Sequence, residues 1–412
     1  MTATEPVYLD HAATTPMSRV ALAAMTEQLE RTGNPSSLHG AGRRAHRVVE
    51  NAREDLAAAV GCHPTEVIFT SGGTEADNLA LKGLYWARTA AEPQRNVIYV
   101  SSIEHHAVTD TAEWLQSHEG AQVRWIPVNA LGQVDCAWLE AELAAAPERV
   151  ACIAVMWANN EVGTVQPVAR IAELAARYDI PVHTDAVQAV TAVDVDFAAS
   201  GVATLAVSGH KIGGPVGIGA LLVRRDVSLT AVIHGGGHER SMRSGTLNAA
   251  AAAGFAAAAR DGVARLADES ARLAGLRDRL IAGVRAAAPD ARLSGPEDAG
   301  HSGERLPANA HFTFPGCEGD SLLFVLDMLG VQSSTGSACT AGVPRPSHVL
   351  LAMGYSEDQA RGAQRFSLGH TTTPQDVDTL VDAIAEAYAR AKKAGMASTE
   401  SSIRTAGTGF SS

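Results

Sequence analysis

The chain has 412 residues, a length at which one hydrophobic core usually gives way to two, so we expect two lobes. Its formal net charge of -12 lacks the basic surface that nucleic acid or an anionic membrane would require. The five cysteines are widely spaced without a CxxC pair, which argues against a disulfide framework or a structural zinc site. The N-terminus lacks a signal-peptide pattern, so we expect a cytoplasmic protein.

Seven short apolar runs alternate with helical patterns through the first two thirds of the chain. Most runs are continuously apolar, as strands covered on both faces are. The alternation predicts an α/β fold with a mostly parallel sheet, which binds ligands outside the carboxyl ends of its strands. The runs are 66–71, 96–101, 123–128, 151–157, 181–185, 203–208 and 219–224. The helical patterns include 74–88, 139–146 and 168–178.

The sequence pattern changes from about residue 249, and we expect long helices rich in Ala, Arg and Leu from there to residue 287. A loop rich in Pro, Gly and Asp follows, and then a strand-like stretch at 309–314. We expect a large domain at 15–262 and a smaller α+β domain formed by 1–14 with 263–392. The chain from Lys393 has few bulky apolar residues, which predicts disorder at 393–412.

Two residues near strand ends suggest an aldehyde cofactor. Lys211 ends the segment Ser208-Gly209-His210-Lys211 and can form a Schiff base, although a single lysine is more often a solvated surface residue. Asp185 follows the run at 181–185 and can pair with a protonated pyridine nitrogen, although such an Asp more often caps a helix. Together they favour pyridoxal phosphate.

Other groups at strand ends fit the same cofactor. The turn before Gly73 and Thr74 leads into a helix whose N-terminus favours a phosphate, or is an ordinary capped helix start. Ser208 and His210 add possible phosphate donors. His105 follows a strand, where an imidazole can stack on a ring and carry a proton, although a lone His is usually structural.

Three later segments carry further candidates. Cys339 lies in the small, polar loop 333–342, which suits a reactive thiol better than a buried structural one, and a thiol without a role is the alternative. Arg365 can bind a substrate carboxylate in bidentate fashion, although a surface ion pair is the commoner use. The Gly-rich, basic segment 234–246 suits an anion, and Thr246 at its end can reach a phosphate.

Ten blocks of this sequence, in their order, resemble the cysteine desulfurases of the NifS/IscS type. These belong to the class V aminotransferase group of fold-type I pyridoxal enzymes, which have the aspartate-aminotransferase-like fold. The resemblance runs from about residue 7 to residue 381, and some features look like actinobacterial members. The blocks are YLDHAATTP, GNPSSLHG, FTSGGTEADNLA, EHHAV, NNEVG, HTDAVQ, SGHKIGGPVGIGAL, HGGGHERSMRSGT, STGSACTAG and RFSLG.

The resemblance implies a role for each site residue around the cofactor ring of pyridoxal 5'-phosphate. Lys211 would carry the cofactor, and Asp185 would pair with the pyridine nitrogen. His105, rather than His106, would stack on the ring. Gln188 and Asn160 would hydrogen-bond the side of the ring that bears the phenolic oxygen.

The resemblance also implies how the phosphate and the substrate are held. Arg365 and Asn160 would orient the carboxylate of L-cysteine, and Cys339 would receive its sulfur. His370 departs from the pattern, since many relatives have arginine there, and this affects fine substrate or dimer contacts rather than the chemistry. The phosphate ligands would be Gly73, Thr74, Ser208 and His210, with Thr246 reaching in from the partner subunit of a homodimer.

The expected reaction converts L-cysteine to L-alanine and leaves a persulfide on Cys339. Lys211 would remove the Cα proton, and His105 would take a thiol proton. By resemblance the sulfur passes to an Fe–S scaffold or a tRNA-thiolation protein. No metal site is certain, but Cys339 could briefly ligate a nascent Fe–S cluster. The alternatives are a selenocysteine lyase or another pyridoxal β-lyase, and more distantly an aminotransferase or a catalytically silent scaffold.

Overall fold

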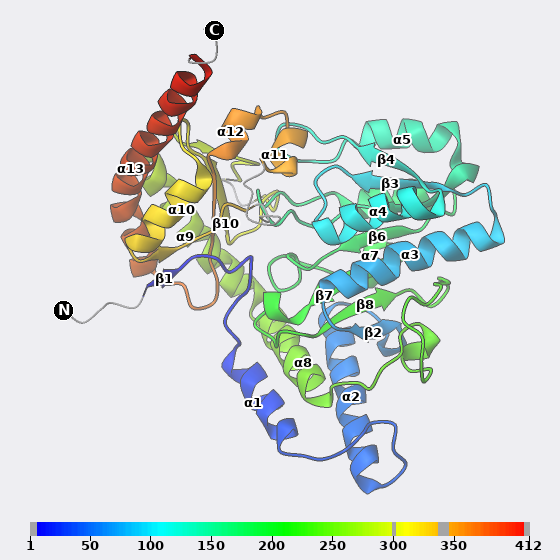
Figure 1. The fold of residues 1–412 in the computed structure, drawn as a ribbon. Coiled ribbons are helices and arrows are strands. Elements are labelled where there is room, and N and C mark those ends of the chain that lie inside the picture. The colour runs from blue at the N-terminus through cyan, green and yellow to red at the C-terminus, as the bar shows by residue number, and fades with distance from the viewer. Residues whose placement is uncertain (1–5, 299–301, 337–345, 408–412) are drawn as a thin grey trace.

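The computed structural model describes residues 6–298, 302–336 and 346–407, and the side chains of these ranges up to residue 394. Figure 1 shows two groups of elements, each with its own sheet. The larger group surrounds a seven-stranded sheet. The smaller group contains a three-stranded sheet and packs at the side of the first. Each group has its own hydrophobic core, as expected for a chain of this length.

The large sheet has the strand order β2-β8-β7-β6-β5-β3-β4. Strand β8 runs in the opposite direction to the other six strands of this sheet, so the sheet is mostly parallel as predicted. Each of the seven predicted apolar runs overlaps one of the strands, so the run assignments are confirmed. The strands are β2 Val67–Thr70, β3 Val97–Ser101, β4 Gln122–Ile126, β5 Val150–Ala154, β6 Val182–Asp185, β7 Thr204–Ser208 and β8 Gly219–Val223.

Helices cover both faces of this sheet, which explains why the strands are apolar throughout. One face packs against α3 and α4, and the other packs against α2, α5, α6, α7 and α8. The three predicted helical stretches correspond to α3, α5 and α6. The helices are α1 Arg19–Leu29, α2 Gly40–Ala59, α3 Gly73–Ala91, α4 His106–Glu119, α5 Cys136–Ala145, α6 Val168–Ala176, α7 Phe197–Ser200 and α8 Ala249–Ala264.

The small sheet is antiparallel, in the order β12-β10-β9. Its outer face packs on the long helices, and a parallel pair of β1 with β11 adjoins it. The predicted strand at 309–314 is β10. The elements are β1 Val7–Tyr8, α9 Leu266–Ala287, β9 Arg292–Leu293, β10 Asn309–Thr313, α10 Gly319–Met328, β11 Val331–Gln332, α11 His348–Ala352, α12 Glu357–Arg361, β12 Ala363–Ser367 and α13 Pro374–Gly407.

The C-terminal helix differs from the sequence expectation. Disorder was predicted from Lys393, but α13 continues to Gly407. Alanine and other good helix formers at the start of that stretch extend the helix beyond the part that packs on α9 and α10, although the stretch is poor in bulky apolar residues. The composition of this stretch indicated that it has no face that could pack in a core. It did not reveal that the stretch favours a helix.

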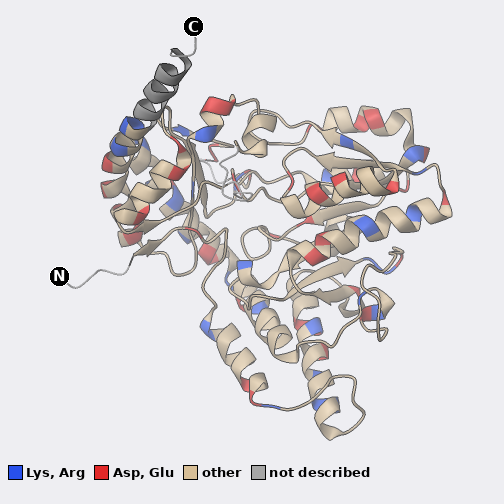
Figure 2. Cartoon of the chain, viewed as in Figure 1, with Lys and Arg blue, Asp and Glu red and all other residues tan. Residues whose placement is uncertain are grey.

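Charged residues lie mainly on helices and loops. Figure 2 shows the strands of the large sheet almost free of Lys, Arg, Asp and Glu, with Arg124 and Asp185 as the exceptions in the sequence. Within the described part of the chain, no helix is long and apolar enough to cross a membrane.

The core of the small domain gives a stability prediction. Phe312 on β10 is fully buried, whereas Phe324 on α10 is 66% exposed. We expect Phe312→Ala to lower the free energy of unfolding by about 3–5 kcal/mol, because it leaves a cavity. Phe324→Ala is the matched control and should change it by less than about 0.5 kcal/mol. Urea unfolding measures both, and equal effects would contradict this assignment of the core.

Candidate active site

A cavity of about 380 Å³ lies at the carboxyl ends of the parallel strands, between the two groups of elements. This is where an open α/β sheet binds its ligand. Residues from α3, the β3–α4 junction, β6, β7 and β12 line it. Ten of the predicted site residues are among them: Gly73, Thr74, His105, Asn160, Asp185, Gln188, Ser208, His210, Lys211 and Arg365.

Lys211 reaches this cavity from the short 3-10 turn η3, Gly209–Lys211, which follows β7 directly. Its Nζ donates to the main-chain carbonyls of Ala12 at 2.6 Å and Ala13 at 2.7 Å. Burial, followed by the nearby Arg365 guanidinium, lowers the pKa of the ammonium from 10.5 to about 8. A substantial fraction of this amine is therefore neutral near physiological pH, as a nucleophile or base requires.

Asp185 ends β6, and its Oδ1 accepts a hydrogen bond from the amide of Val187 at 2.8 Å. Burial raises the pKa of Asp185 to about 7, and Asp77 adds to the shift. Asp77 lies behind it on α3 and contacts His183 Nε2 at 3.1 Å, while His183 Nδ1 contacts Thr204 Oγ1 at 2.9 Å. Burial raises the pKa of Asp77 and lowers that of His183, so this pair is neutral at neutral pH.

His105 is the N-cap of α4. Its Nδ1 accepts a hydrogen bond from the amide of Ala107 at 3.1 Å, so the neutral ring carries its proton on Nε2. Burial lowers the pKa of His105, which favours this neutral form. Glu104 beside it accepts from the amide of Met156 at 2.6 Å with one oxygen, and its other oxygen has no partner among the described residues. Burial raises the pKa of Glu104 well above its usual range.

The opposite end of the cavity is suited to an anion. Helix α3 begins at Gly73, so its free amides face this end, where the helix dipole favours negative charge. A Cβ added to Gly73 would meet Val187 Cγ2 at 2.9 Å, so this position needs glycine. The Ser208 hydroxyl is buried without a partner in the described residues. His210 Nδ1 contacts Thr14 Oγ1 at 3.2 Å, and burial lowers the pKa of His210 to about 4.

Arg365 closes the cavity from the small sheet. Its side chain is 4% exposed and forms an ion pair with Asp10 at 2.8 Å. Its Nη1 also donates to the main-chain carbonyl of Asn160 at 2.9 Å, so the main chain rather than the amide side chain of Asn160 makes this contact. The guanidinium is thereby held in one orientation at the cavity wall.

One predicted site residue is not among the residues that line this cavity, and another is not described by the structure. Thr246 is exposed and lies instead beside Ser71 and Arg243. Cys339 lies outside the described residues. Burial raises the pKa of all four other thiols: Cys62 to about 12, Cys152 to about 12, Cys317 to about 11, and Cys136.

Comparison with known proteins fits this geometry. A model of the aminotransferase class-V family matches residues 7–380. The chain belongs to the class-V aminotransferase family. It is 53% identical to the IscS-like cysteine desulfurase of Mycobacterium tuberculosis, over 95% of this chain and 98% of that protein.

Two solved structures show the same fold. A NifS-like protein from Rickettsia africae aligns with a TM-score of 0.83 at 30% identity, over 93% of this chain and 99% of that one. SspA in complex with cysteine aligns with a TM-score of 0.73 at 33% identity, over 88% of this chain and 98% of that one. The expected fold, a pyridoxal fold-type I architecture of this family, is therefore confirmed.

The sequence did not point to three side chains and two main-chain carbonyls that contribute to this class-V site. Asp10 was quoted only inside a family block, and its pairing with Arg365 spans the whole chain. Asp77 lies just beyond the first turn of α3, where an acid carries no sequence signal of its own, and Glu104 was named only beside His105. The carbonyls of Ala12 and Ala13 have no side-chain signal at all. Asp77 and Glu104 differ from ordinary acidic residues because they are buried. Sequence patterns do not reveal the burial of polar residues.

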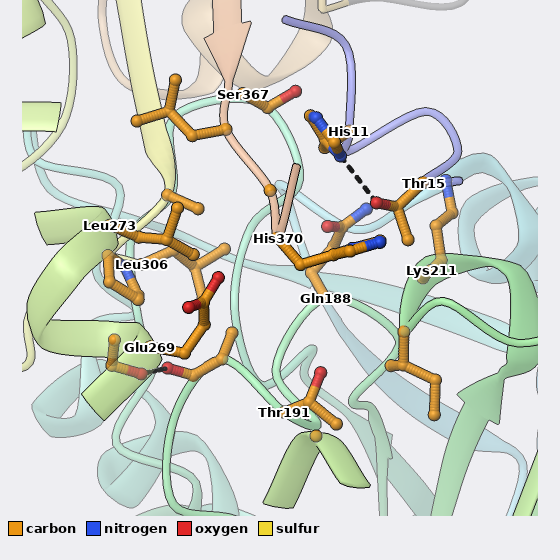
Figure 3. A pocket seen from close by; sticks show the side chains of 18 of the residues that line it. His11, Thr15, Gln188, Thr191, Lys211, Glu269, Leu273, Leu306, Ser367 and His370 are labelled. Carbon is orange, nitrogen blue, oxygen red and sulfur yellow. Dashed lines mark hydrogen bonds between the residues drawn. The ribbon is translucent and has the colours of Figure 1, made fainter. Parts of the chain in front are cut away.

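A second cavity, of about 130 Å³, adjoins the first behind Lys211 and Gln188 (Figure 3). His370 lies here and not in the main cavity, with its ring 6.4 Å from that of His11. His11 Nδ1 in turn contacts Thr15 Oγ1 at 2.6 Å. The unusual histidine at position 370 therefore shares the second cavity with Lys211 and Gln188, two predicted cofactor ligands that also line the main cavity.

The surroundings of Lys211 predict a pH dependence in cofactor-free protein. With a pKa near 8, its acetylation by trace acetic anhydride should rise with a midpoint near pH 8 rather than 10.5. Asp10→Asn removes an anion that favours the ammonium, so the midpoint should fall further. Asp320→Asn, at an exposed position on α10, is the control and should leave the midpoint unchanged. Mass spectrometry of the Lys211 peptide measures this. A higher midpoint in Asp10→Asn would contradict the electrostatic account.

Proposed function

We propose that this chain is a pyridoxal-phosphate-dependent cysteine desulfurase, which converts L-cysteine to L-alanine and transfers the sulfur to Cys339. The observation that carries the proposal is the meeting of Lys211, Asp185 and Arg365 in one cavity. The amine is partly neutral, the carboxyl is buried, and the guanidinium is fixed at the wall. This combination is typical of a pyridoxal enzyme acting on an amino acid.

The side chains present fit the cofactor. The unpartnered Ser208 hydroxyl and the free amides at the start of α3 offer donors to a phosphate, and Gly73 leaves the space that a Cβ would fill. Asp185 is buried and forms no ion pair with a described residue, and a protonated pyridine nitrogen would give its carboxylate a paired cation. The phosphate would be held by Gly73, Thr74, Ser208 and His210, and the ring by Asp185, His105, Gln188 and Asn160.

When bound, pyridoxal phosphate supplies an aldehyde that condenses with amines and a ring that accepts the electron pair left at the substrate Cα. The protein supplies the proton transfers. Lys211 Nζ, with its lowered pKa, accepts the Cα proton. The neutral His105 ring carries its proton on Nε2, so it would donate a hydrogen bond to the sulfur of the substrate, whose thiol keeps its proton until it is attacked. The expected role of His105 in taking a thiol proton stays a prediction.

Arg365 would orient the substrate through its carboxylate. The guanidinium already holds one carboxylate, that of Asp10, and remains beside the cavity. Charge-assisted hydrogen bonds from a fixed guanidinium are strong and directional, which is what places Cα above Lys211.

The sulfur would pass to Cys339. A sulfur–sulfur bond forms on its thiolate while the carbon–sulfur bond of the substrate breaks. The electron pair stays on the carbon, which takes a proton and becomes the methyl group of alanine. The four other thiols have raised pKa values and none lines the cavity, which supports Cys339 as the acceptor.

We further propose a homodimer in the cytoplasm. Thr246 lies outside the cavity of its own chain and is exposed, as a residue serving a partner subunit would be. The large domain would span 15–262, and the small domain 1–14 with 263–392. An Fe–S scaffold or a tRNA-thiolation protein would accept the sulfur.

Removing the sulfur acceptor tests the reaction. We expect Cys339→Ala to retain the cofactor absorbance but to form alanine and sulfide from L-cysteine more than about 100-fold more slowly. Cys136→Ala, which removes a partly exposed thiol elsewhere, should keep the wild-type rate. Lys211→Ala should lose the absorbance of lysine-bound cofactor. Sulfide release by Cys339→Ala at the wild-type rate would rule out the persulfide mechanism.

Removing the carboxylate clamp tests substrate binding. Arg365→Gln should lower kcat/KM for L-cysteine by about 10- to 100-fold, mostly through KM, since it removes charge-assisted hydrogen bonds. Arg361→Gln, at an exposed position at the C-terminal end of α12, is the matched control and should behave as wild type. An unchanged KM in Arg365→Gln would contradict the assignment.

A further inference from the structure

The segment 234–246 contains an unusual turn. Glu239, Arg240 and Ser241 are consecutive non-glycine residues with positive φ angles of 46°, 55° and 60°. L-residues rarely adopt this region, so such a turn persists only where its surroundings fix it. The segment therefore needs anchors, and the structure contains two ionic ones.

The first anchor is Glu239. Its side chain is 1% exposed and receives both Nη groups of Arg53 from α2, at 2.7 and 2.9 Å. The same carboxylate accepts from the amide of Phe69 at 2.7 Å, and Arg53 donates to the carbonyl of Val67. Strand β2 is at the edge of the sheet, so this pair satisfies backbone groups that no further strand covers.

The second anchor is Arg243. Its Nε donates to Glu75 at 2.8 Å, and both side chains are less than one fifth exposed. Glu75 is in the first turn of α3, and its other oxygen accepts from the amide of Ser71 at 2.8 Å. The Arg243–Glu75 ion pair therefore holds the turn from Ser71 to Thr74, which is the phosphate turn of the proposed site.

Thr246 follows three residues after Arg243. It is exposed, and with Ser71 and Arg243 it lines one small cavity. Two residues later, Asn248 caps α8 by accepting from the amide of Ala251 at 3.0 Å. Thr246 is thus held between the ion pair on one side and a capped helix on the other, and it is not among the residues that line the cofactor cavity of its own chain.

We infer that the Arg243–Glu75 ion pair is a positioning contact that couples the two cofactor sites of a dimer. It ties the phosphate turn of its own subunit to the segment that presents Thr246 to the partner. A buried ion pair adds little net stability compared with apolar packing, but it fixes geometry. The inference rests on the proposed function, because it requires pyridoxal phosphate and a homodimer.

Mixed dimers test this directly. One subunit carries Lys211→Ala and cannot bond the cofactor covalently, so the absorbance of lysine-bound cofactor reports only the other subunit. Arg243→Gln is placed either in the reporting subunit or in the silent one. Titration of the cofactor-free dimers with pyridoxal phosphate gives the apparent Kd of the reporting site in each arrangement. Arg170→Gln, in an exposed pair on α6, is the matched control.

We expect Arg243→Gln to raise this Kd by about five- to tenfold in both arrangements, because it removes one charge-assisted contact. In the reporting subunit this loosens the phosphate turn, and in the silent subunit it loosens the segment that presents Thr246. Thr246→Ala should raise it only from the silent subunit. Arg243→Lys, which keeps the charge, should give a smaller increase. Glu75→Gln should reproduce Arg243→Gln, and the double variant should be no worse than either alone.

An effect of Arg243→Gln in only one arrangement, or in neither, would overturn the coupling while leaving the proposed function intact. If Arg243→Gln prevents dimer formation, the same comparison is made with Arg243→Lys and Glu75→Gln, and equal Kd values in wild type and both variants overturn it. If Thr246→Ala in the silent subunit leaves the Kd of the reporting site unchanged, both the coupling and the shared site are overturned. Absence of cofactor absorbance in wild type would overturn the proposed function itself.

Discussion

The ion pair between Arg365 and Asp10 is the contact on which the site depends. Arg365 belongs to the small sheet, Asp10 follows the first strand of the chain, and the carbonyl of Asn160 belongs to the loops of the large sheet. The main chain of Arg365 also pairs with Ser334, just before the segment that carries Cys339. Through its side chain and its main chain, Arg365 thus brings together the wall of the cavity, the N-terminal strand and Ser334. Because its side chain is almost fully buried, its orientation is fixed before any substrate arrives.

Burial controls the protonation of the groups around this contact. The cavity brings Asp77, Glu104 and Asp185 close together, and each is desolvated enough to raise its pKa. The same desolvation lowers the pKa values of Lys211 and His105. The site is consequently less charged than its composition suggests, and each group lies nearer to the protonation state in which it can exchange a proton at neutral pH.

Sequence predicted the parts of this arrangement that depend on local pattern. Apolar runs identified the seven strands, and the rule that ligands bind at strand ends placed Lys211 and Asp185 in one cavity. The roles of Gln188 and Asn160 came from family resemblance, because an amide side chain has no local signature of ligand binding. Asp10 escaped notice because its partner is 355 residues away. The helix beyond Lys393 was missed because composition reports core-forming capacity, not helical propensity.

The cavity has opposite preferences at its two ends, and these explain why one cofactor fits it. Asp185 is a buried acid that forms no ion pair with a described residue, so positive charge is favoured there. The start of α3 and the unpartnered Ser208 hydroxyl favour negative charge at the other end. A ligand with a protonated ring nitrogen and a phosphate satisfies both at once. Lys211 lies in the same cavity with an amine that is neutral often enough to react. The fold thus creates one region that favours a cation and one that favours an anion, and the bound cofactor would supply both charges beside the Lys211 amine.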